Sequence, residues 1–121
     1  DIVVVLLPLT DQTANLMDKA AFDAMPPGSY LINCARGEIV AEDDLIAALD
    51  SGHLAGATLD AFRSEPLASG HPLWRHPKVR VTPHIASLSA IATAAPILAE
   101  QVRRARSGAP LRDLADTGGG Y

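Results

Sequence analysis

The chain has 121 residues, of which 48% are apolar, and a formal net charge of -4 at pH 7. This length supports one globular core rather than two independent domains, and the scattered basic residues exclude an extended basic face for nucleic acid or an anionic membrane. The single cysteine excludes an internal disulfide, and no apolar run approaches the roughly 20 residues of a membrane helix, so we expect a cytoplasmic protein.

The first predicted element is a strand over residues 2–7, which read IVVVLL. A nearly continuous apolar and β-branched run is typical of a buried parallel strand, and Pro8 stops it because proline cannot donate to a ladder. The chain opens directly on this strand without an initiator methionine. We therefore expect a piece of a longer protein whose sheet has further strands.

Residues 13–25 are predicted to be helical, because their apolar residues recur at three- and four-residue spacing. Asp18 is a candidate cap for a second turn within this region, and the run PPG at 26–28 ends it. A second strand is predicted over residues 29–34, followed by an isolated arginine, Arg36, and Gly37. Three acidic residues then mark the amino end of a helix that starts at residue 42 and stops at Gly52.

Residues 54–59 form a weaker predicted strand that ends at Asp60. Residues 63–77 are rich in Pro, Gly, Ser and His and predict an irregular loop, with Leu73 and Trp74 holding it to the core. A short strand over residues 79–82 ends in Pro83 and His84.

A helix is predicted over residues 89–106, with an apolar stripe and with Pro96 either in its first turn or at a kink. Arg103, Arg104 and Arg106 are expected on its exposed face. The tail from residue 107 is polar, and we expect it to be weakly ordered.

Strands that alternate with helices predict an α/β fold with a doubly wound parallel sheet and right-handed crossovers. Because parallel strands end at the same edge of the sheet, Pro8, Arg36, Asp60 and His84 are expected to gather there, where ligands bind in such folds.

The residues at this edge predict the reduction of a 2-oxo acid. An arginine fork matches a carboxylate and polarises an adjacent carbonyl, and a histidine such as His84 exchanges a proton near neutral pH. Glu65 is the best candidate for the carboxylate that raises the pKa of this histidine. A hydride source is also needed, yet the chain has no G-x-G-x-x-G motif, and the GGG at 118–120 follows no strand.

Each of these residues also has a purely structural interpretation. Arg36 is then a surface arginine in a salt bridge, His84 a loop histidine bound to backbone, Asp60 a turn cap and Glu65 a solvated carboxylate. Cys34 is interpreted as a small buried filler, with a reactive thiol as the alternative. The other histidines, His53, His71 and His76, are assigned to loops without a role and lack the spacing of a metal site.

Two runs carry a family resemblance: LINCARGEIVAEDDLIAALDSGHLAGATLDAFRSEPL and HPLWRHPKVRVTPHIAS. They resemble the D-isomer-specific 2-hydroxyacid dehydrogenases, and in particular the bacterial glyoxylate/hydroxypyruvate reductases of the A type. The resemblance implies the second half of a Rossmann-type NAD(P)-binding domain over residues 1–88, a helix over 89–107 that packs on a substrate domain outside this chain, and a tail over 108–121. It also implies a homodimer as the whole protein and, for the isolated chain, no activity.

The resemblance further implies roles for individual residues. Arg36 would anchor the substrate carboxylate, His84 would be the acid/base and Glu65 its partner. The resemblance favours NADP over NAD as the cofactor. The cofactor would contact Arg36 and His84 and seven further residues: Leu7, Pro8, Leu9, Ala35, Asp60, Ala86 and Ser87. A non-catalytic module that senses dinucleotide or binds a partner remains the alternative, because corepressor relatives keep the same three residues.

Overall fold

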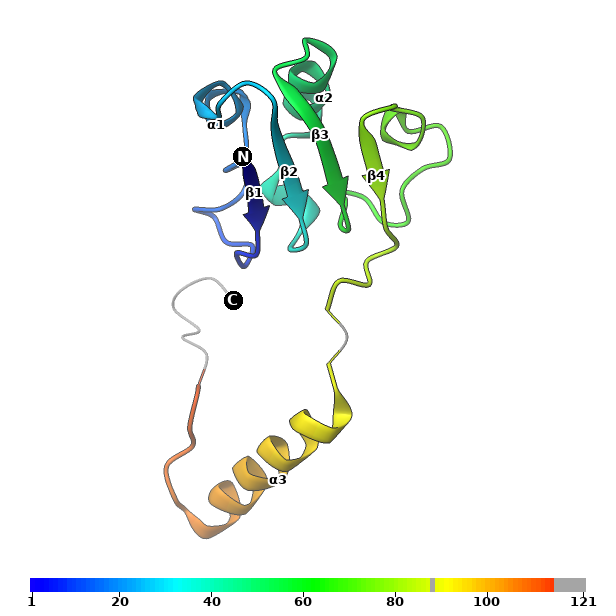
Figure 1. The fold of residues 1–121 in the computed structure, drawn as a ribbon. Helices are drawn as coiled ribbons and strands as arrows, with labels where there is room; N and C mark the ends of the chain where they lie inside the picture. The colour runs from blue at the N-terminus through cyan, green and yellow to red at the C-terminus, as the bar shows by residue number, and fades with distance from the viewer. Residues whose placement is uncertain (88, 115–121) are drawn as a thin grey trace.

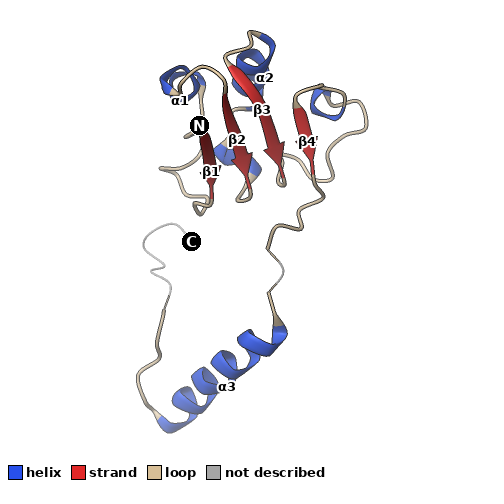
Figure 2. Cartoon of the chain, viewed as in Figure 1, coloured by secondary structure: helices blue, strands red, loops and turns tan. Residues whose placement is uncertain are grey.

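The computed structural model describes residues 1–87 and 89–114 and contains a four-stranded parallel sheet (Figures 1 and 2). The strands lie in chain order: β1 (Ile2–Val5), β2 (Ser29–Asn33), β3 (Leu54–Leu59) and β4 (Val79–Val81). Every neighbouring pair is parallel, which confirms the predicted α/β architecture. The predicted first strand was two residues too long, and the second and fourth were each one residue too long.

The helices that connect the strands cover one face of the sheet. These are α1 (Lys19–Ala24), between β1 and β2, and α2 (Glu42–Asp50), between β2 and β3. The strands lie in the sheet in the same order as in the chain, and right-handed crossovers between such strands place every connecting helix on the same face of the sheet. The opposite face of the sheet therefore remains open. Ile2, Val4 and Tyr30 are exposed on β1 and β2 accordingly.

The prediction of helix over residues 13–25 was wrong in its first half. Thr13 Oγ1 accepts from the Thr10 N–H at 2.7 Å and donates to the Pro8 carbonyl at 2.7 Å, and these local bonds favour turns over a helix. Met17 instead pairs with Val40 in an isolated parallel bridge. Asp18 does cap the helix that follows, since its Oδ1 accepts from the Ala21 N–H at 3.0 Å.

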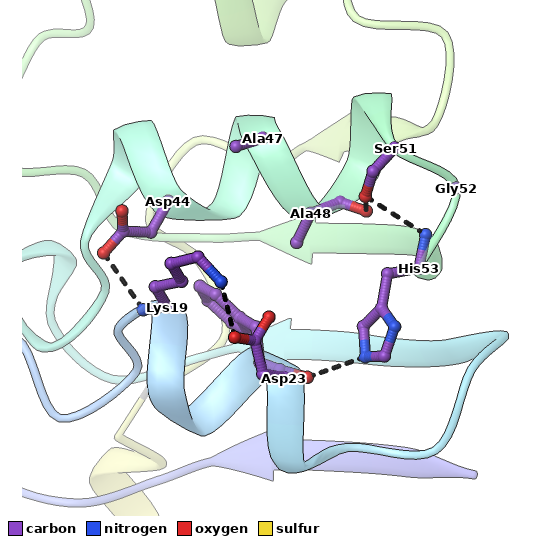
Figure 3. A pocket seen from close by; sticks show the side chains of 9 residues that line it. Lys19, Asp23, Asp44, Ala47, Ala48, Ser51, Gly52 and His53 are labelled. Atoms are coloured by element: carbon purple, nitrogen blue, oxygen red, sulfur yellow. Dashed lines mark hydrogen bonds and ion pairs between the residues drawn. The ribbon is translucent and has the colours of Figure 1, made fainter.

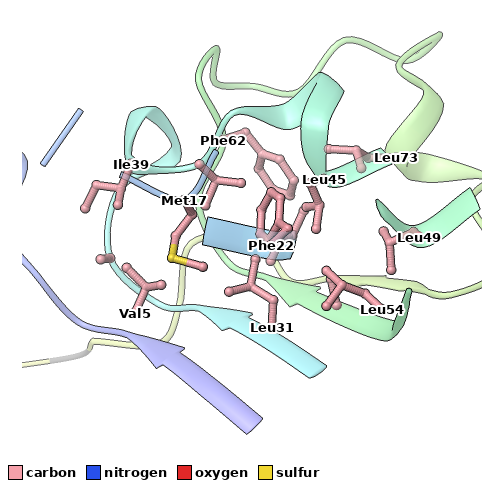
Figure 4. Close-up of a cluster of buried hydrophobic side chains, with 14 of the residues drawn as sticks. Val5, Met17, Phe22, Leu31, Ile39, Leu45, Leu49, Leu54, Phe62 and Leu73 are labelled. Atoms are coloured by element: carbon pink, nitrogen blue, oxygen red, sulfur yellow. The ribbon is translucent and has the colours of Figure 1, made fainter. Parts of the chain in front are cut away.

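The core lies between the sheet and the two helices (Figure 4). Phe22 of α1, Leu45 and Leu49 of α2 and Leu31 of β2 are almost completely buried there. The buried residues drawn and labelled together with these are Val5, Met17, Ile39, Leu54, Phe62 and Leu73. The loop of residues 63–77 contains a short 3-10 helix, η2 (Pro72–Trp74), in which Leu73 is buried as predicted. Trp74 was predicted wrongly, because its side chain is half exposed and donates to the Ala68 carbonyl.

The last helix, α3 (Ile91–Ser107), lies apart from the sheet in Figure 1, and none of its residues is buried. Its predicted apolar stripe is therefore exposed, and Pro96 lies inside the helix. After Gly108, the chain folds back so that Arg112 and Gln101 exchange two hydrogen bonds, at 2.8 and 3.1 Å. The weak order predicted for the tail stays a prediction. Leu88 and the remainder of the tail, residues 115–121, lie outside the described residues. Within the described ranges, no helix is long and apolar enough to span a membrane.

Candidate active site at the carboxyl edge of the sheet

The strand ends place the predicted site residues along one edge in the order of the strands. The loop after β1 carries Leu7, Pro8 and Leu9, β2 leads to Arg36, β3 to Asp60 and β4 to His84. Arg36 and His84 therefore flank the end of β3, while the loop after β1 lies at the far end of the row. This order is the one expected for an open parallel sheet that binds ligand at its carboxyl edge.

Asn33, the last residue of β2, shapes the turn that presents Arg36. Its side chain is completely buried, and its Oδ1 accepts from the Ala35 N–H at 3.0 Å while its Nδ2 donates to the Arg36 carbonyl at 2.9 Å. Because both ends of the amide are used, the backbone of this turn is fixed. The guanidinium of Arg36 is exposed and donates from Nη1 to the Ala35 carbonyl at 2.9 Å.

Gly37 lies directly against the chain that carries Glu65. A Cβ at this position would lie 1.9 Å from the Phe62 carbonyl carbon and 2.3 Å from the Arg63 nitrogen. The short 3-10 helix η1 (Gly37–Ile39) begins here, so the Arg36 turn and the segment after β3 are in contact through backbone alone. Only glycine allows this approach.

Two carboxylates hold successive backbone N–H groups of the segment after β3. Glu65 Oε1 accepts from the Phe62 N–H at 2.9 Å, and Glu42 Oε1, at the start of α2, accepts from the Arg63 N–H at 3.1 Å. The Arg63 side chain donates back to the carbonyl of Val40 at 3.3 Å. The segment is therefore fixed to both α2 and the residues that follow Arg36.

His84 and Glu65 form a hydrogen-bonded pair, with His84 Nδ1 and Glu65 Oε2 2.8 Å apart. An ionised carboxylate only accepts, so Nδ1 carries the donated proton and Nε2 is the ring nitrogen left for a substrate. His84 has a left-handed backbone, with φ of 54°, a conformation that costs a non-glycine residue about 1 kcal/mol or more. This conformation turns the ring toward Glu65 immediately after Pro83.

The pKa of Glu65 is lowered from its ordinary value, chiefly by the hydrogen bond from His84 and next by the one from the Phe62 N–H. Burial opposes this shift, and the positive charge of Arg36 adds to it. The three residues thus influence one another electrostatically, with Glu65 held as the anion between two cationic partners when the histidine is protonated.

Asp60 is buried and organises the turn that carries His84. Its Oδ1 accepts from Thr82 Oγ1 at 2.5 Å and from the Ile85 N–H at 3.0 Å, and its Oδ2 accepts from the Ala86 N–H at 2.8 Å. Burial raises the pKa of this carboxyl, but these three hydrogen bonds together outweigh burial and leave the pKa below its ordinary value. The charged form is therefore the stable one in the folded chain.

A hollow of about 220 Å³ brings together the three predicted catalytic residues. Arg36, Glu65 and His84 line it, with Gly37, Glu38, Ala61, Phe62 and Arg63 around them. The predicted cofactor residues outside the catalytic group do not line this hollow: Leu7, Pro8, Leu9, Ala35, Asp60, Ala86 and Ser87. Their predicted contacts with a cofactor remain predictions.

A larger hollow of about 650 Å³ lies between α1 and α2, away from the strand ends (Figure 3). Its polar groups are bonded to one another: Lys19 pairs with Asp23, and Asp44 accepts from the Lys19 N–H at 3.0 Å. His53, predicted to have no role, places Nε2 2.8 Å from the Phe22 carbonyl and 2.9 Å from that of Met25, at the end of α1. These contacts hold the two helices together, so this hollow is a helix junction rather than the candidate site.

Sequence reasoning missed four residues that position the site: Asn33, Glu42, Arg63 and Thr82. Asn33, one residue before the end of the predicted strand, was a usable signal, because asparagine side chains bond to nearby backbone. The contacts of the other three join segments 21 or more positions apart, and no local pattern indicates them.

The parallel sheet, the ligand edge and an arginine beside a carboxylate-paired histidine are typical of the dinucleotide-binding domain of a dehydrogenase. The comparisons with known proteins agree with this class. The family described as D-isomer specific 2-hydroxyacid dehydrogenase, NAD binding domain, matches residues 1–86. The chain therefore belongs to the D-isomer specific 2-hydroxyacid dehydrogenases.

Individual relatives are similar over nearly the whole chain. Glyoxylate/hydroxypyruvate reductase A of Salmonella choleraesuis (strain SC-B67) is 43% identical over 120 residues, which are 99% of this chain and 38% of that protein. A D-isomer specific 2-hydroxyacid dehydrogenase from Xanthobacter autotrophicus Py2, solved with NADPH and MES, superposes with a TM-score of 0.94 at 50% identity, over 99% of this chain and 50% of the other.

An NADPH-dependent glyoxylate/hydroxypyruvate reductase from Sinorhizobium meliloti, solved with NADP and sulfate, has a TM-score of 0.92 at 37% identity, over 100% of this chain and 40% of the other. The chain thus spans less than two fifths of the length of the curated relative from Salmonella.

Proposed function

We propose that the protein to which this chain belongs reduces a short 2-oxo acid, such as glyoxylate or hydroxypyruvate, to the 2-hydroxy acid with NADPH or NADH. One observation supports the proposal above all. His84 and Glu65 form a hydrogen bond of 2.8 Å, and both residues line the same hollow as Arg36. The names of the Salmonella and Sinorhizobium relatives support the same substrates.

In this proposal Arg36 binds the carboxylate of the 2-oxo acid. Its guanidinium is exposed at the hollow, and its fork of donors matches a carboxylate in two parallel hydrogen bonds. A further N–H donor of the guanidinium would polarise the neighbouring carbonyl. The Asn33 amide fixes the turn behind it, so that the guanidinium is presented at a defined point of the edge.

His84 supplies the proton in the same step. The nicotinamide, when bound, supplies the hydride that reaches the carbonyl carbon. The carbonyl oxygen, which gains the electron pair of the carbonyl π bond, takes the proton from His84 Nε2, and the product is the neutral alcohol. Glu65 holds Nδ1 and stabilises the charged ring before transfer, which keeps the ring oriented with Nε2 toward the substrate.

The edge of the sheet fits the nicotinamide end of a dinucleotide. Leu7 is exposed and Pro8 and Leu9 are half-buried at its far end, and Ala35, Ala86 and Ser87 flank the middle. Asp60 Oδ2 accepts only the Ala86 N–H in the described structure, so this oxygen keeps an acceptor position for an amide such as the nicotinamide carboxamide. We propose NADP over NAD because two of the similar structures hold NADPH or NADP.

The remaining proposals concern the whole protein. The exposed apolar stripe of α3 supports the packing of residues 89–107 on a substrate domain outside this chain. We also propose a cytoplasmic homodimer. The one cysteine, which is free, supports the cytoplasmic location. The absence of a G-x-G-x-x-G motif from the chain supports inactivity of the isolated 121 residues.

The test is a steady-state assay of the whole protein with glyoxylate and NADPH. Replacing Arg36 by alanine should lower kcat/KM, with a loss of about 3 kcal/mol in transition-state stabilisation. Arg36→Lys should recover only part of this loss. Arg75→Ala is the matched control, because Arg75 is exposed and does not line the hollow. An unchanged kcat/KM for Arg36→Ala refutes the assignment of Arg36.

The same assay separates the alternative function. A whole protein that binds NADPH at micromolar concentration but turns over no 2-oxo acid would be a sensing or partner-binding module of this fold.

A further inference from the structure

A second hollow adjoins the His84–Glu65 pair on an apolar side. It has a volume of about 220 Å³, and Glu65 and His84 line it as they line the Arg36 hollow. Its other walls include Pro66, Leu67, Trp74 and Pro83. We call it the Trp74 recess. The catalytic pair therefore stands between a hollow that contains a guanidinium and one that is almost entirely apolar.

Apart from His84 Nε2, which meets the carbonyl oxygen in the proposed reaction, the polar side-chain groups named below already have partners. Trp74 Nε1 donates to the Ala68 carbonyl at 3.0 Å, and Thr82 Oγ1 donates to Asp60. Both oxygens of Glu65 accept, one from the Phe62 N–H and one from His84. A polar ligand group would find no free donor among these groups, whereas an apolar group loses nothing by entering.

We propose that the Trp74 recess binds the substituent on the carbonyl carbon of the 2-oxo acid, so that the enzyme also accepts 2-oxo acids with apolar side chains. This inference rests on the proposed function. The carbonyl carbon of a 2-oxo acid is trigonal and planar, so its carboxylate, its oxygen and its substituent point in three directions of one plane. With the carboxylate on Arg36 and the oxygen at His84, the substituent takes the third direction, on the side away from Arg36, where the Trp74 recess adjoins His84.

The size of the recess sets the range of substituents. An engineered apolar cavity of about 150 Å³ takes a benzene ring. A recess of about 220 Å³ therefore accommodates propyl and branched groups and reaches the size of a phenyl ring. Each methylene that leaves water for an apolar site should raise kcat/KM by roughly fourfold.

The first experiment needs no variant. The whole protein is assayed with NADPH and with pyruvate, 2-oxobutyrate and 2-oxovalerate, which differ by one methylene each and share nearly the same carbonyl reactivity. The expected result is a rise in kcat/KM of about 15-fold from pyruvate to 2-oxovalerate. A flat or falling series shows that the recess does not take the substituent, and it overturns the proposal.

Two variants locate the effect in the recess. Leu67→Trp should fill it and lower the ratio of kcat/KM for 2-oxovalerate to that for pyruvate by at least fivefold. Trp74→Ala removes a wall and should lower the same ratio about fourfold. Tyr30→Ala is the matched control, because Tyr30 is an aromatic residue of similar exposure, 49% against 50% for Trp74, at the opposite end of the sheet.

The outcomes separate the two proposals. If glyoxylate and pyruvate are reduced but both variants keep the wild-type ratio, the recess assignment is wrong and the proposed function stands. If the wild-type protein reduces no 2-oxo acid, the proposed function fails and the recess assignment fails with it. A variant that does not fold leaves the wild-type series as the deciding measurement.

Discussion

Replacing Gly37 by alanine should damage both stability and activity. The added Cβ would lie 1.9 Å from the carbonyl carbon of Phe62 and 2.3 Å from the Arg63 nitrogen. Comfortable contacts between carbon atoms begin at about 3.5 Å, so one of the two backbones must move by roughly 1.6 Å. Because the neighbours are backbone atoms rather than flexible side-chain ends, rotamer changes cannot relieve the clash.

The magnitudes follow from this displacement. Overpacking of this kind typically costs up to about 3 kcal/mol of unfolding free energy. The contact of Gly37 with the Phe62 backbone sets the position of Arg36 relative to Glu65 and His84, so the shift also moves Arg36 away from these two residues. A misplacement of about 1 Å lowers the catalytic rate on the order of 100-fold. We therefore expect kcat/KM for glyoxylate to fall about 100-fold, which corresponds to roughly 2.7 kcal/mol.

The assay combines urea unfolding of the whole protein with steady-state NADPH oxidation. Gly70→Ala is the matched control, since a Cβ at Gly70 meets nothing within 4 Å. The control should remain within about 0.5 kcal/mol of the wild type, as expected for a surface substitution. If Gly37→Ala matches the wild type in both measurements, the backbone contact between the Arg36 turn and the Glu65 segment does not position the site.

Two further predictions concern neighbouring residues. Because the folded-state pKa of Glu65 lies below its ordinary value of 4.5, its ionisation stabilises the fold above that pH and the stabilisation is lost as the pH falls through the folded pKa. The difference in unfolding free energy between wild type and Glu65→Gln should therefore shrink on acidification, and a difference independent of pH would contradict this. Asn33→Ala leaves the Ala35 N–H and the Arg36 carbonyl without their partner, so urea unfolding should show a loss of about 1–3 kcal/mol. Asn33→Asp keeps the acceptor for the Ala35 N–H but buries a charge whose second oxygen faces the Arg36 carbonyl, so it should lose at least as much, and equal stability of all three proteins would refute the role of the amide.

Local signals were sufficient where short-range chemistry decides the structure. The bounds of β3 were predicted without error, because Gly52 stops the preceding helix and Asp60 ends the apolar run. The first helix was predicted too long, since periodicity alone cannot weigh the side-chain bonds of Thr10 and Thr13 against helix formation. Trp74 was expected to hold the loop to the core, but its side chain is half exposed, lines the Trp74 recess and donates to the Ala68 carbonyl.

The site was predictable to the extent that it follows from topology. Once the strands are parallel, the residues after β2, β3 and β4 must share an edge, and the expected group of Arg36, Glu65 and His84 does line one hollow. The contacts that set their geometry were not predictable, because they join segments that are distant in sequence. The pairing of Glu42 with the Arg63 N–H is one such contact, and the packing of Gly37 on Phe62 is another.

Asp60 illustrates how the structure changes the meaning of a correctly located residue. The sequence placed it at the ligand edge, where the family resemblance implied a cofactor contact. The structure has it buried, with three of its acceptor positions used by Thr82, Ile85 and Ala86 on either side of His84. These bonds hold the turn in which His84 adopts its left-handed backbone, and they lower the pKa of Asp60 although burial raises it. The position of the proton donor in the proposed reaction therefore depends on the hydrogen bonds that Asp60 accepts, whether or not the fourth acceptor position of that residue meets a cofactor.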